Sequence, residues 1–184
     1  MKTIETSRLL LRPFTASDFD ETYRLLYADE TVARWWTGYR EFEKIKSAFA
    51  EKVKQAEDDF GFMAVVRKVD MRLMGTVAIQ PYSPHEDTSW LQLEADPAYR
   101  VGANPDFLEA ELTYAIGREY WRNGYALEAS RALVQHGFVA LNVRRFVNSV
   151  LADNQASVGL MRALGFQIQR TASSNGIVGI LERS

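Results

Sequence analysis

The chain has 184 residues and a formal net charge of −2, because 24 acidic side chains slightly outnumber 22 basic ones. No cysteine is present, which excludes a disulfide scaffold, a thiolate nucleophile and a cysteine-ligated metal. The two histidines and the near-neutral charge predict neither a metal site nor a nucleic-acid partner. Since no apolar run approaches the roughly 20 residues that span a bilayer, we expect one soluble, cytoplasmic domain over residues 1–184 with no membrane partner.

The hydrophobic pattern predicts strands and helices that alternate along the chain. Strands are expected over residues 4–14, 60–69, 72–81, 107–116, 145–152, 167–171 and 177–182. Helices are expected over residues 19–26, 41–57, 127–141 and 155–164, with a loop or short helix over 29–38. Gly75 is expected to mark a β-bulge, and the irregular stretch from Ser83 to Asp106 is typical of a functional loop. The alternation predicts an α/β or α+β fold with a mixed sheet.

The most informative segment runs from Gly117 to Ala126, between an expected strand and the clearest expected helix. The first N–H groups of a helix have no intrahelical partner and lie at the positive end of its dipole, which favours anions. Gly124 has no Cβ to keep a phosphate away from the backbone, and Arg118 and Arg122 could add positive charge. An ordinary connecting loop, with Gly124 as a turn residue, explains the same residues equally well, and Asn123 could cap the helix.

A second candidate segment, Asp153 to Ser157, precedes the last expected helix. A structural role explains most of it, because Asp153 or Asn154 fits an N-cap and Gly165 fits the left-handed residue that ends a helix. The chain has no serine-nucleophile elbow, and its histidines, His85 and His136, do not favour nucleophilic catalysis.

Five segments, taken in order, carry a resemblance: Ile4–Pro13, Ala110–Ile116, Tyr120–Ala129, Asn154-x-x-Ser157 and Leu164-Gly165-Phe166. Together they resemble the GNAT superfamily of acyl-CoA-dependent N-acyltransferases, and most of all the branch typified by the Rim ribosomal-protein N-acetyltransferases. The resemblance implies a central, mostly antiparallel, splayed sheet flanked by helices. It also implies acetyl-CoA as co-substrate, with no metal.

The resemblance implies two groups of cofactor contacts in the strand and the loop. The backbone of Tyr114, Ala115 and Ile116 would pair with the pantetheine amides. The backbone N–H groups that would hold the pyrophosphate follow Trp121, which takes the first place of the loop pattern, and they belong to Arg122, Asn123, Gly124, Tyr125, Ala126 and Leu127. Positive charge near the cofactor would come from Arg118, Arg122, Arg131 and Arg162.

The resemblance also implies that Asn154 contacts the pantetheine arm and that Ser157 lies near the thioester sulfur. Arg122 departs from the glycine of many branch members, and Met161 stands where many superfamily members carry a tyrosine general acid. Ser157 or solvent would therefore protonate the leaving thiolate. Glu111 is the preferred general base, although an exposed-strand or ion-pair role is equally open.

Tyr114 and Glu86 are weaker candidates for the base, and a main-chain N–H near Tyr114 is expected to bind the oxyanion. We expect direct acetyl transfer from acetyl-CoA to a primary amine, such as a protein N-terminal α-amine. The alternatives are a small-molecule amine acetyltransferase, a non-catalytic acyl-CoA-binding module and a structural interaction domain. Trp35, Trp36 and the stretch from Ser83 to Asp106 would build the acceptor pocket. A homodimer is possible, although no residue establishes it.

Overall fold

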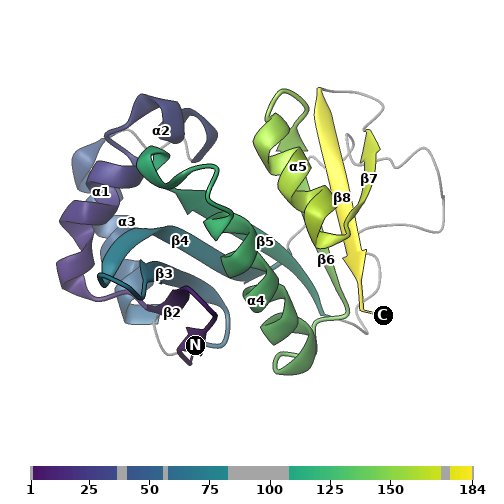
Figure 1. Ribbon diagram of the computed structural model, residues 1–184, viewed down its shortest axis with the longest axis horizontal. Helices are drawn as coiled ribbons and strands as arrows, with labels where there is room; N and C mark the ends of the chain where they lie inside the picture. Colours follow the sequence, from purple (N-terminus) through teal and green to yellow (C-terminus); the bar gives the residue numbers. More distant parts are fainter. Residues whose placement is uncertain (1, 37–40, 56–57, 83–107, 171–174, 184) are drawn as a thin grey trace. The chain divides into compact units, whose positions relative to one another are not determined.

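The computed structural model describes residues 2–36, 41–55, 58–82, 108–170 and 175–183, and its elements are labelled in Figure 1. The strands are β1 (Ile4–Glu5), β2 (Leu9–Pro13), β3 (Gly61–Arg67), β4 (Arg72–Pro81), β5 (Glu109–Ile116), β6 (Arg145–Leu151), β7 (Gln167–Arg170) and β8 (Gly176–Glu182). The α-helices are α1 (Phe19–Leu26), α2 (Glu30–Trp36), α3 (Phe42–Lys54), α4 (Tyr125–Val139) and α5 (Gln155–Leu164). Short 3₁₀ helices span Ala16–Asp18 and Arg118–Tyr120.

The strands form one eight-stranded sheet in the order β1-β2-β3-β4-β5-β6-β8-β7. The pairs β1–β2, β2–β3, β3–β4, β6–β8 and β7–β8 are antiparallel, and β5–β6 is parallel. The expected mixed, mostly antiparallel sheet with flanking helices is therefore confirmed. The contacts divide the chain into two compact units, residues 1–79 with 113–133 and residues 80–112 with 134–184, and each is described by itself.

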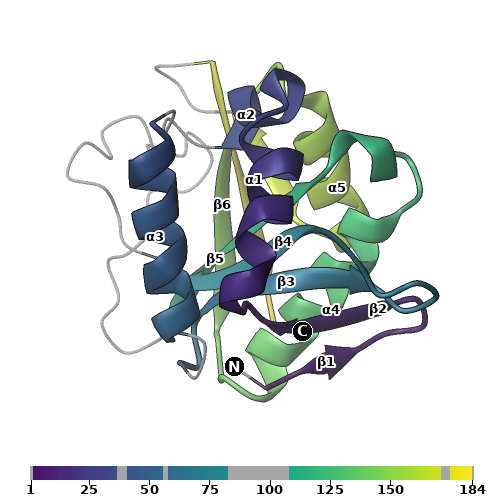
Figure 2. The same ribbon diagram turned by 90° about the vertical axis from the view of Figure 1, so that its left-hand side faces the viewer.

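In the first unit, α1 and α3 lie on one face of strands β2 to β4, and the start of α4 lies on the other (Figures 1 and 2). Apolar side chains on these strands and helices are fully buried, among them Leu9, Leu11, Leu26, Met63, Met74 and Leu133. Aromatic rings of α1 and α3 meet edge to face, as in the pairs Phe19–Phe42 and Phe19–Phe49. The start of α4 is thus fixed on a packed sheet.

The N-terminal segment differs from the expectation of one strand over residues 4–14. It forms two strands, β1 and β2, which pair in antiparallel fashion. Between them Thr6, Ser7 and Arg8 leave the sheet and donate hydrogen bonds to the carboxylate of Glu128 on α4. The Thr6 N–H donates to the Leu9 carbonyl (2.9 Å), so residues 6–9 form the turn between the two strands, and the Glu128 carboxylate satisfies further donors of this turn.

Gly75 marks the bulge predicted for β4. The β3–β4 register shifts between Val65, which lies opposite Gly75, and Val66, which lies opposite Leu73. A Cβ at Gly75 would lie 2.1 Å from the carbonyl oxygen of Ala115 on β5. Only glycine allows β5 to approach β4 this closely.

In the second unit, α5 packs against β8. A Cβ at Gly179 of β8 would lie 3.0 Å from the sulfur of Met161 on α5 and 3.2 Å from Ile168 on β7. Met161 and Val178 are fully buried. The absence of a side chain at Gly179 lets the helix lie close to the strand.

Candidate functional site

The loop between β5 and α4 bends twice through the left-handed region, at Arg122 (φ +60°) and Gly124 (φ +76°). Left-handed backbone is accessible to glycine and costs a residue with a Cβ roughly 1–2 kcal/mol. The glycine of many branch members at the position of Arg122 therefore has a physical explanation. The backbone here has the conformation that glycine favours, although the side chain is arginine.

Two side chains of this loop, those of Trp121 and Asn123, donate hydrogen bonds to carbonyl oxygens of the same segment. The Trp121 indole donates to the carbonyl of Ile116 (2.6 Å), and the Asn123 amide donates to the carbonyls of Trp121 (2.9 Å) and Tyr120 (3.2 Å). Among the hydrogen bonds of the described residues, none runs from an N–H at the start of α4 to the Asn123 side chain, so the cap expected at Asn123 is not observed, and a connecting loop with Gly124 as a turn residue stays open. In the described part of the chain, no side chain accepts a hydrogen bond from the N–H groups of residues 122–127. Such N–H groups at a helix start can bind an anion.

A carboxylate in the first turn of α4 joins the loop to the N-terminal strands. Glu128 accepts hydrogen bonds from Thr6 Oγ1 (2.6 Å), Ser7 Oγ (3.0 Å), Arg8 N (2.9 Å) and Arg8 Nε (2.6 Å). Burial opposes its ionisation, but the hydrogen bonds from Thr6 and Arg8 prevail and lower the pKa of Glu128 from 4.5 to about 2. We call these four residues the Glu128 cluster.

Arg8 is a site residue that the sequence analysis missed. Its Nη1 donates to the carbonyl of Asn123 (3.0 Å), and its Nη2 would lie 3.5 Å from a Cβ at Gly124. Arg118, which we expected near the anion, pairs instead with Asp29 (2.9 Å). A cation beside the loop thus comes from the turn that precedes β2, more than 110 positions away in the sequence.

The three β5 residues predicted to pair with pantetheine end the strand in the first unit. Tyr114 is half-buried, and Ala115 and Ile116 are buried. The Ile116 carbonyl has one lone pair engaged by the Trp121 indole, and the following N–H, of Gly117, donates to the Met74 carbonyl (2.8 Å). The loop therefore begins from a firmly held strand end.

The predicted base, Glu111, lies half-buried on β5 in the second unit. Tyr82 lies near it, and the Tyr82 N–H donates to the carbonyl of Glu109 (2.8 Å). Burial, together with the negative charges of Glu111 and Glu109, raises the pKa of Tyr82 to about 12. The phenol therefore stays protonated at neutral pH and can donate a hydrogen bond but cannot serve as a base. The sequence analysis did not identify Tyr82.

The backbone ladder between β5 and β6 contains the pairs Glu109↔Arg145 and Ala110↔Phe146, the first of which is also a buried ion pair. This register places Leu112 opposite Asn148. There, the Leu112 N–H donates to Asn148 Oδ1 (3.1 Å), and Asn148 Nδ2 donates to the Leu112 carbonyl. A buried side-chain amide thus replaces the backbone partner where the ladder ends, as a splayed sheet requires.

The structural interpretation of the second motif is correct for its ends. Asn154 is the N-cap of α5, where its Oδ1 accepts the Ser157 N–H (3.2 Å), and Gly165 ends the helix at φ +95°. Ser157 itself is half-buried. Met161 is fully buried against β8, so it fills the core at the position where many superfamily members carry a tyrosine.

The acceptor pocket expected from the sequence is described only at Trp35. Its ring is half-buried and packs against the Arg34 guanidinium, 4.3 Å from the ring centroid. The stretch from Ser83 to Asp106, with Glu86, lies outside the described residues. Within the described ranges, no group of three or more acidic or histidine side chains could hold a metal, and no helix is long and apolar enough to cross a membrane.

Comparison with known proteins agrees with this geometry. The family model of an acetyltransferase (GNAT) domain matches residues 8–167. A curated relative, the uncharacterized N-acetyltransferase YoaA of Bacillus subtilis (strain 168), is 29% identical over 168 residues, which are 89% of this chain and 82% of that protein. The family match includes Arg8, the loop and α5, and it confirms the resemblance.

Solved structures share the fold. An acetyltransferase (GNAT family) from Bacillus anthracis has a TM-score of 0.73 at 17% identity, with 98% of each chain covered. RimL, a ribosomal α-N-protein acetyltransferase in complex with coenzyme A, has a TM-score of 0.70 at 14% identity, with 99% of this chain and 97% of that chain covered. The spermidine N-acetyltransferase SpeG of Vibrio cholerae has a TM-score of 0.63 at 17% identity, with coverage of 96% and 95%. At these identities the likeness shows the fold alone.

Proposed function

The chain belongs to the GNAT family of acetyltransferases, and from this premise we propose that it moves the acetyl group of acetyl-CoA directly to the α-amino group of a protein N-terminus. The observation that carries the proposal is the set of N–H groups over residues 122–127, which have no hydrogen-bond partner among the described residues and lie beside the Arg8 guanidinium. These donors fit a diphosphate, because helix-start amides and an adjacent arginine both favour anions.

The proposed cofactor contacts follow the order of the motifs. The N–H groups of residues 122–127 hold the pyrophosphate, and the backbone of residues 114–116 pairs with the pantetheine amides as an added strand does. In the second unit, Asn154 and Ser157 contact the pantetheine arm and the sulfur. The Asn154 oxygen is already engaged as the helix cap, so its amide N–H₂ is the group proposed to donate.

The proposed chemistry needs no acyl-enzyme, which suits a chain without cysteine. The attacking amine must first be neutral. An α-amine, with a pKa near 7.7–8.0, loses its proton near neutral pH at a cost of about 1 kcal/mol, whereas a lysine amine costs on the order of 4 kcal/mol. Glu111 is the proposed base, and Ser157 or solvent protonates the leaving thiolate, whose pKa near 8.5 makes a strong acid unnecessary.

The acceptor class is tested by release of free thiol from acetyl-CoA with a panel of amines. We expect a peptide with a free N-terminus to be acetylated, and the same peptide with a blocked N-terminus and an internal lysine to react at least about tenfold more slowly at pH 7. Spermidine, an amino sugar and a free amino acid complete the panel. Faster turnover of one of these would favour the small-molecule alternative, and cofactor binding without any transfer would favour a binding module.

Glu111→Gln tests the base. We expect kcat/KM at pH 7 to fall by about 100-fold, because a positioned general base contributes roughly 10²–10⁴. The remaining rate should rise with pH as the free amine itself deprotonates, while KM for acetyl-CoA stays within a factor of about two. Glu51→Gln, which removes an exposed carboxylate of α3, is the matched control. A pH–rate profile identical to that of the wild type would contradict the assignment.

A further inference from the structure

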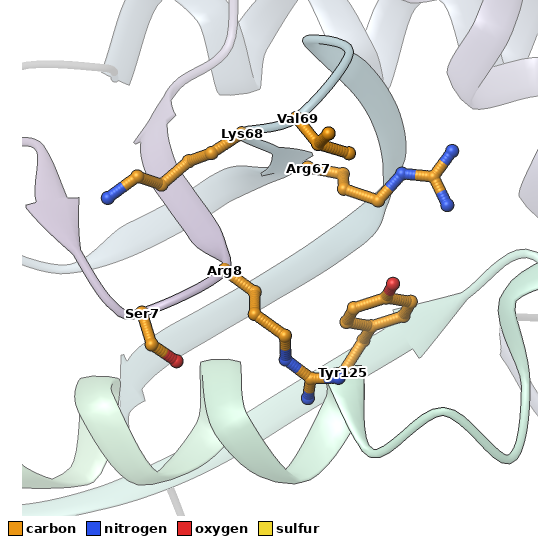
Figure 3. Close-up of a pocket in the computed structure, with 6 residues that line it drawn as sticks. All are labelled: Ser7, Arg8, Arg67, Lys68, Val69 and Tyr125. Carbon is orange, nitrogen blue, oxygen red and sulfur yellow. The ribbon is translucent and has the colours of Figure 1, made fainter.

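A cavity of about 440 Å³ opens beside the first turn of α4 (Figure 3). It lies entirely within the first unit, and its volume falls in the range of about 300–1,000 Å³ that is usual for small-molecule sites. Six of the described residues line it: Ser7, Arg8, Arg67, Lys68, Val69 and Tyr125. Three of the six are cationic and none is acidic.

Acidic residues that do not line the cavity hold its cations in place. Arg67 donates Nε and Nη2 to the two oxygens of Asp70 (2.9 and 2.5 Å), and Lys68 Nζ donates to Glu5 (3.1 Å). Arg67 also donates to the Tyr125 hydroxyl, and Figure 3 shows these two side chains pointing toward one another. With the Arg8–Glu128 pair, each of the three cations has a carboxylate partner, so the cavity offers a fixed set of N–H and O–H donors rather than an excess of positive charge.

The cavity adjoins the loop that is proposed to bind the pyrophosphate. Arg8 lines the cavity, donates to the Asn123 carbonyl (3.0 Å) and lies with its Cζ 4.6 Å from the centroid of the Tyr125 ring. The Nη2 atom of Arg8 also lies close to the proposed pyrophosphate loop, because it would be 3.5 Å from a Cβ at Gly124. One guanidinium therefore borders both places, and a ligand with two separate phosphate groups could use both.

Coenzyme A has such a second group, because its ribose carries a 3′-phosphate in addition to the diphosphate. We propose that the cavity formed by Arg8, Arg67 and Lys68 binds a phosphate monoester, and that in the reaction this group is the 3′-phosphate of acetyl-CoA. The inference rests on the proposed function, since the loop must hold the diphosphate for the 3′-phosphate to reach the cavity. Charge-assisted hydrogen bonds to a phosphate oxygen are among the stronger polar contacts of proteins.

The test compares the dissociation constants of CoA and 3′-dephospho-CoA, measured by titration calorimetry on the full chain. We expect the wild type to bind CoA about tenfold more tightly or better, as one or two charge-assisted hydrogen bonds predict. Arg67→Gln and Lys68→Gln should each bring the ratio of the two dissociation constants, 3′-dephospho-CoA over CoA, closer to one. Lys54→Gln, which removes an exposed lysine of α3 paired with Glu51, should leave the ratio unchanged.

A cooperative thermal unfolding transition establishes that each variant is folded. If Arg67→Gln is not folded, Lys68→Gln alone carries the comparison of the two dissociation constants. Equal affinity of the wild type for the two nucleotides would overturn the assignment of the 3′-phosphate while leaving the proposed function intact. Phosphate bound in ³¹P NMR by the wild type and not by Arg67→Gln would then assign the cavity to free phosphate. A ratio unchanged in both cavity variants would place the 3′-phosphate elsewhere. Failure of both nucleotides to bind would overturn the proposed function itself.

Discussion

Glu128→Gln is expected to lower the free energy of unfolding by about 2–3 kcal/mol at pH 7. The Glu128 carboxylate accepts four hydrogen bonds, two of them from Arg8, so each of these four groups needs an acceptor at this position. A glutamine of the same shape keeps one acceptor oxygen and turns an N–H₂ group toward donors, which leaves at least one of them unsatisfied. Equilibrium urea unfolding, monitored by tryptophan fluorescence, measures the loss.

The same loss has a defined dependence on pH. The pKa of Glu128 is lower in the folded chain (about 2) than its ordinary value of 4.5. Its ionised form therefore stabilises the fold fully above that ordinary value, and the stabilisation disappears as the pH falls from about 4.5 toward 2. The difference between wild type and Glu128→Gln should be constant above about pH 6 and should shrink by about half at pH 3.

Glu119→Gln is the matched control, because Glu119 also pairs with an arginine, Arg24, at 2.6 Å, but its side chain is 49% exposed. An exposed pair of this kind contributes about 0–1 kcal/mol, so the control should unfold nearly as the wild type does. Equal losses of unfolding free energy in the two variants would contradict the claim that the Glu128 hydrogen bonds stabilise the contact between the N-terminal strands and α4. We also expect Glu128→Gln to weaken CoA binding, since Arg8 then loses its anchor beside the loop.

The sequence predicted those features that depend on residues within a few positions of one another. The caps of α5 at Asn154 and Gly165 follow from residue chemistry within a few positions, and so does the glycine bulge at Gly75. The order of strands and helices followed from periodicity, because a buried face repeats at the period of its own element. These are the features for which a short window of sequence contains the whole cause.

The features that were missed depend on residues far apart in the chain. The turn between β1 and β2 donates hydrogen bonds to Glu128, about 120 positions later, and no local pattern indicates that Thr6 and Ser7 donate to it. Arg8 was missed for the same reason. Tyr82 acquires its high pKa because the fold buries it and brings it near Glu111 and Glu109. Charge and hydrogen-bond partners of this kind are properties of the tertiary structure.

Asn148→Leu is expected to lower the free energy of unfolding by about 2–6 kcal/mol. The side chain is 4% exposed, and its amide satisfies both the N–H and the carbonyl of Leu112. Leucine has a similar volume but no polar atom, so two buried backbone groups lose their partners at a cost of about 1–3 kcal/mol each. Ser149→Ala, at an exposed position of the same strand, should change stability by no more than about 0.5 kcal/mol.

Asn148→Asp separates the role of the donor from that of volume. The new carboxylate keeps an acceptor for the Leu112 N–H but turns a negative oxygen toward the Leu112 carbonyl, so the variant should be destabilised at pH 7. Burial raises the pKa of such a carboxyl group, and its protonated form can donate to that carbonyl again. The stability of Asn148→Asp relative to the wild type should therefore recover as the pH falls through the raised pKa, in urea unfolding between pH 7 and pH 4, while Asn148→Leu shows no recovery. Parallel pH dependence of the two variants would mean that the Asn148 donor does not hold the end of the β5–β6 ladder.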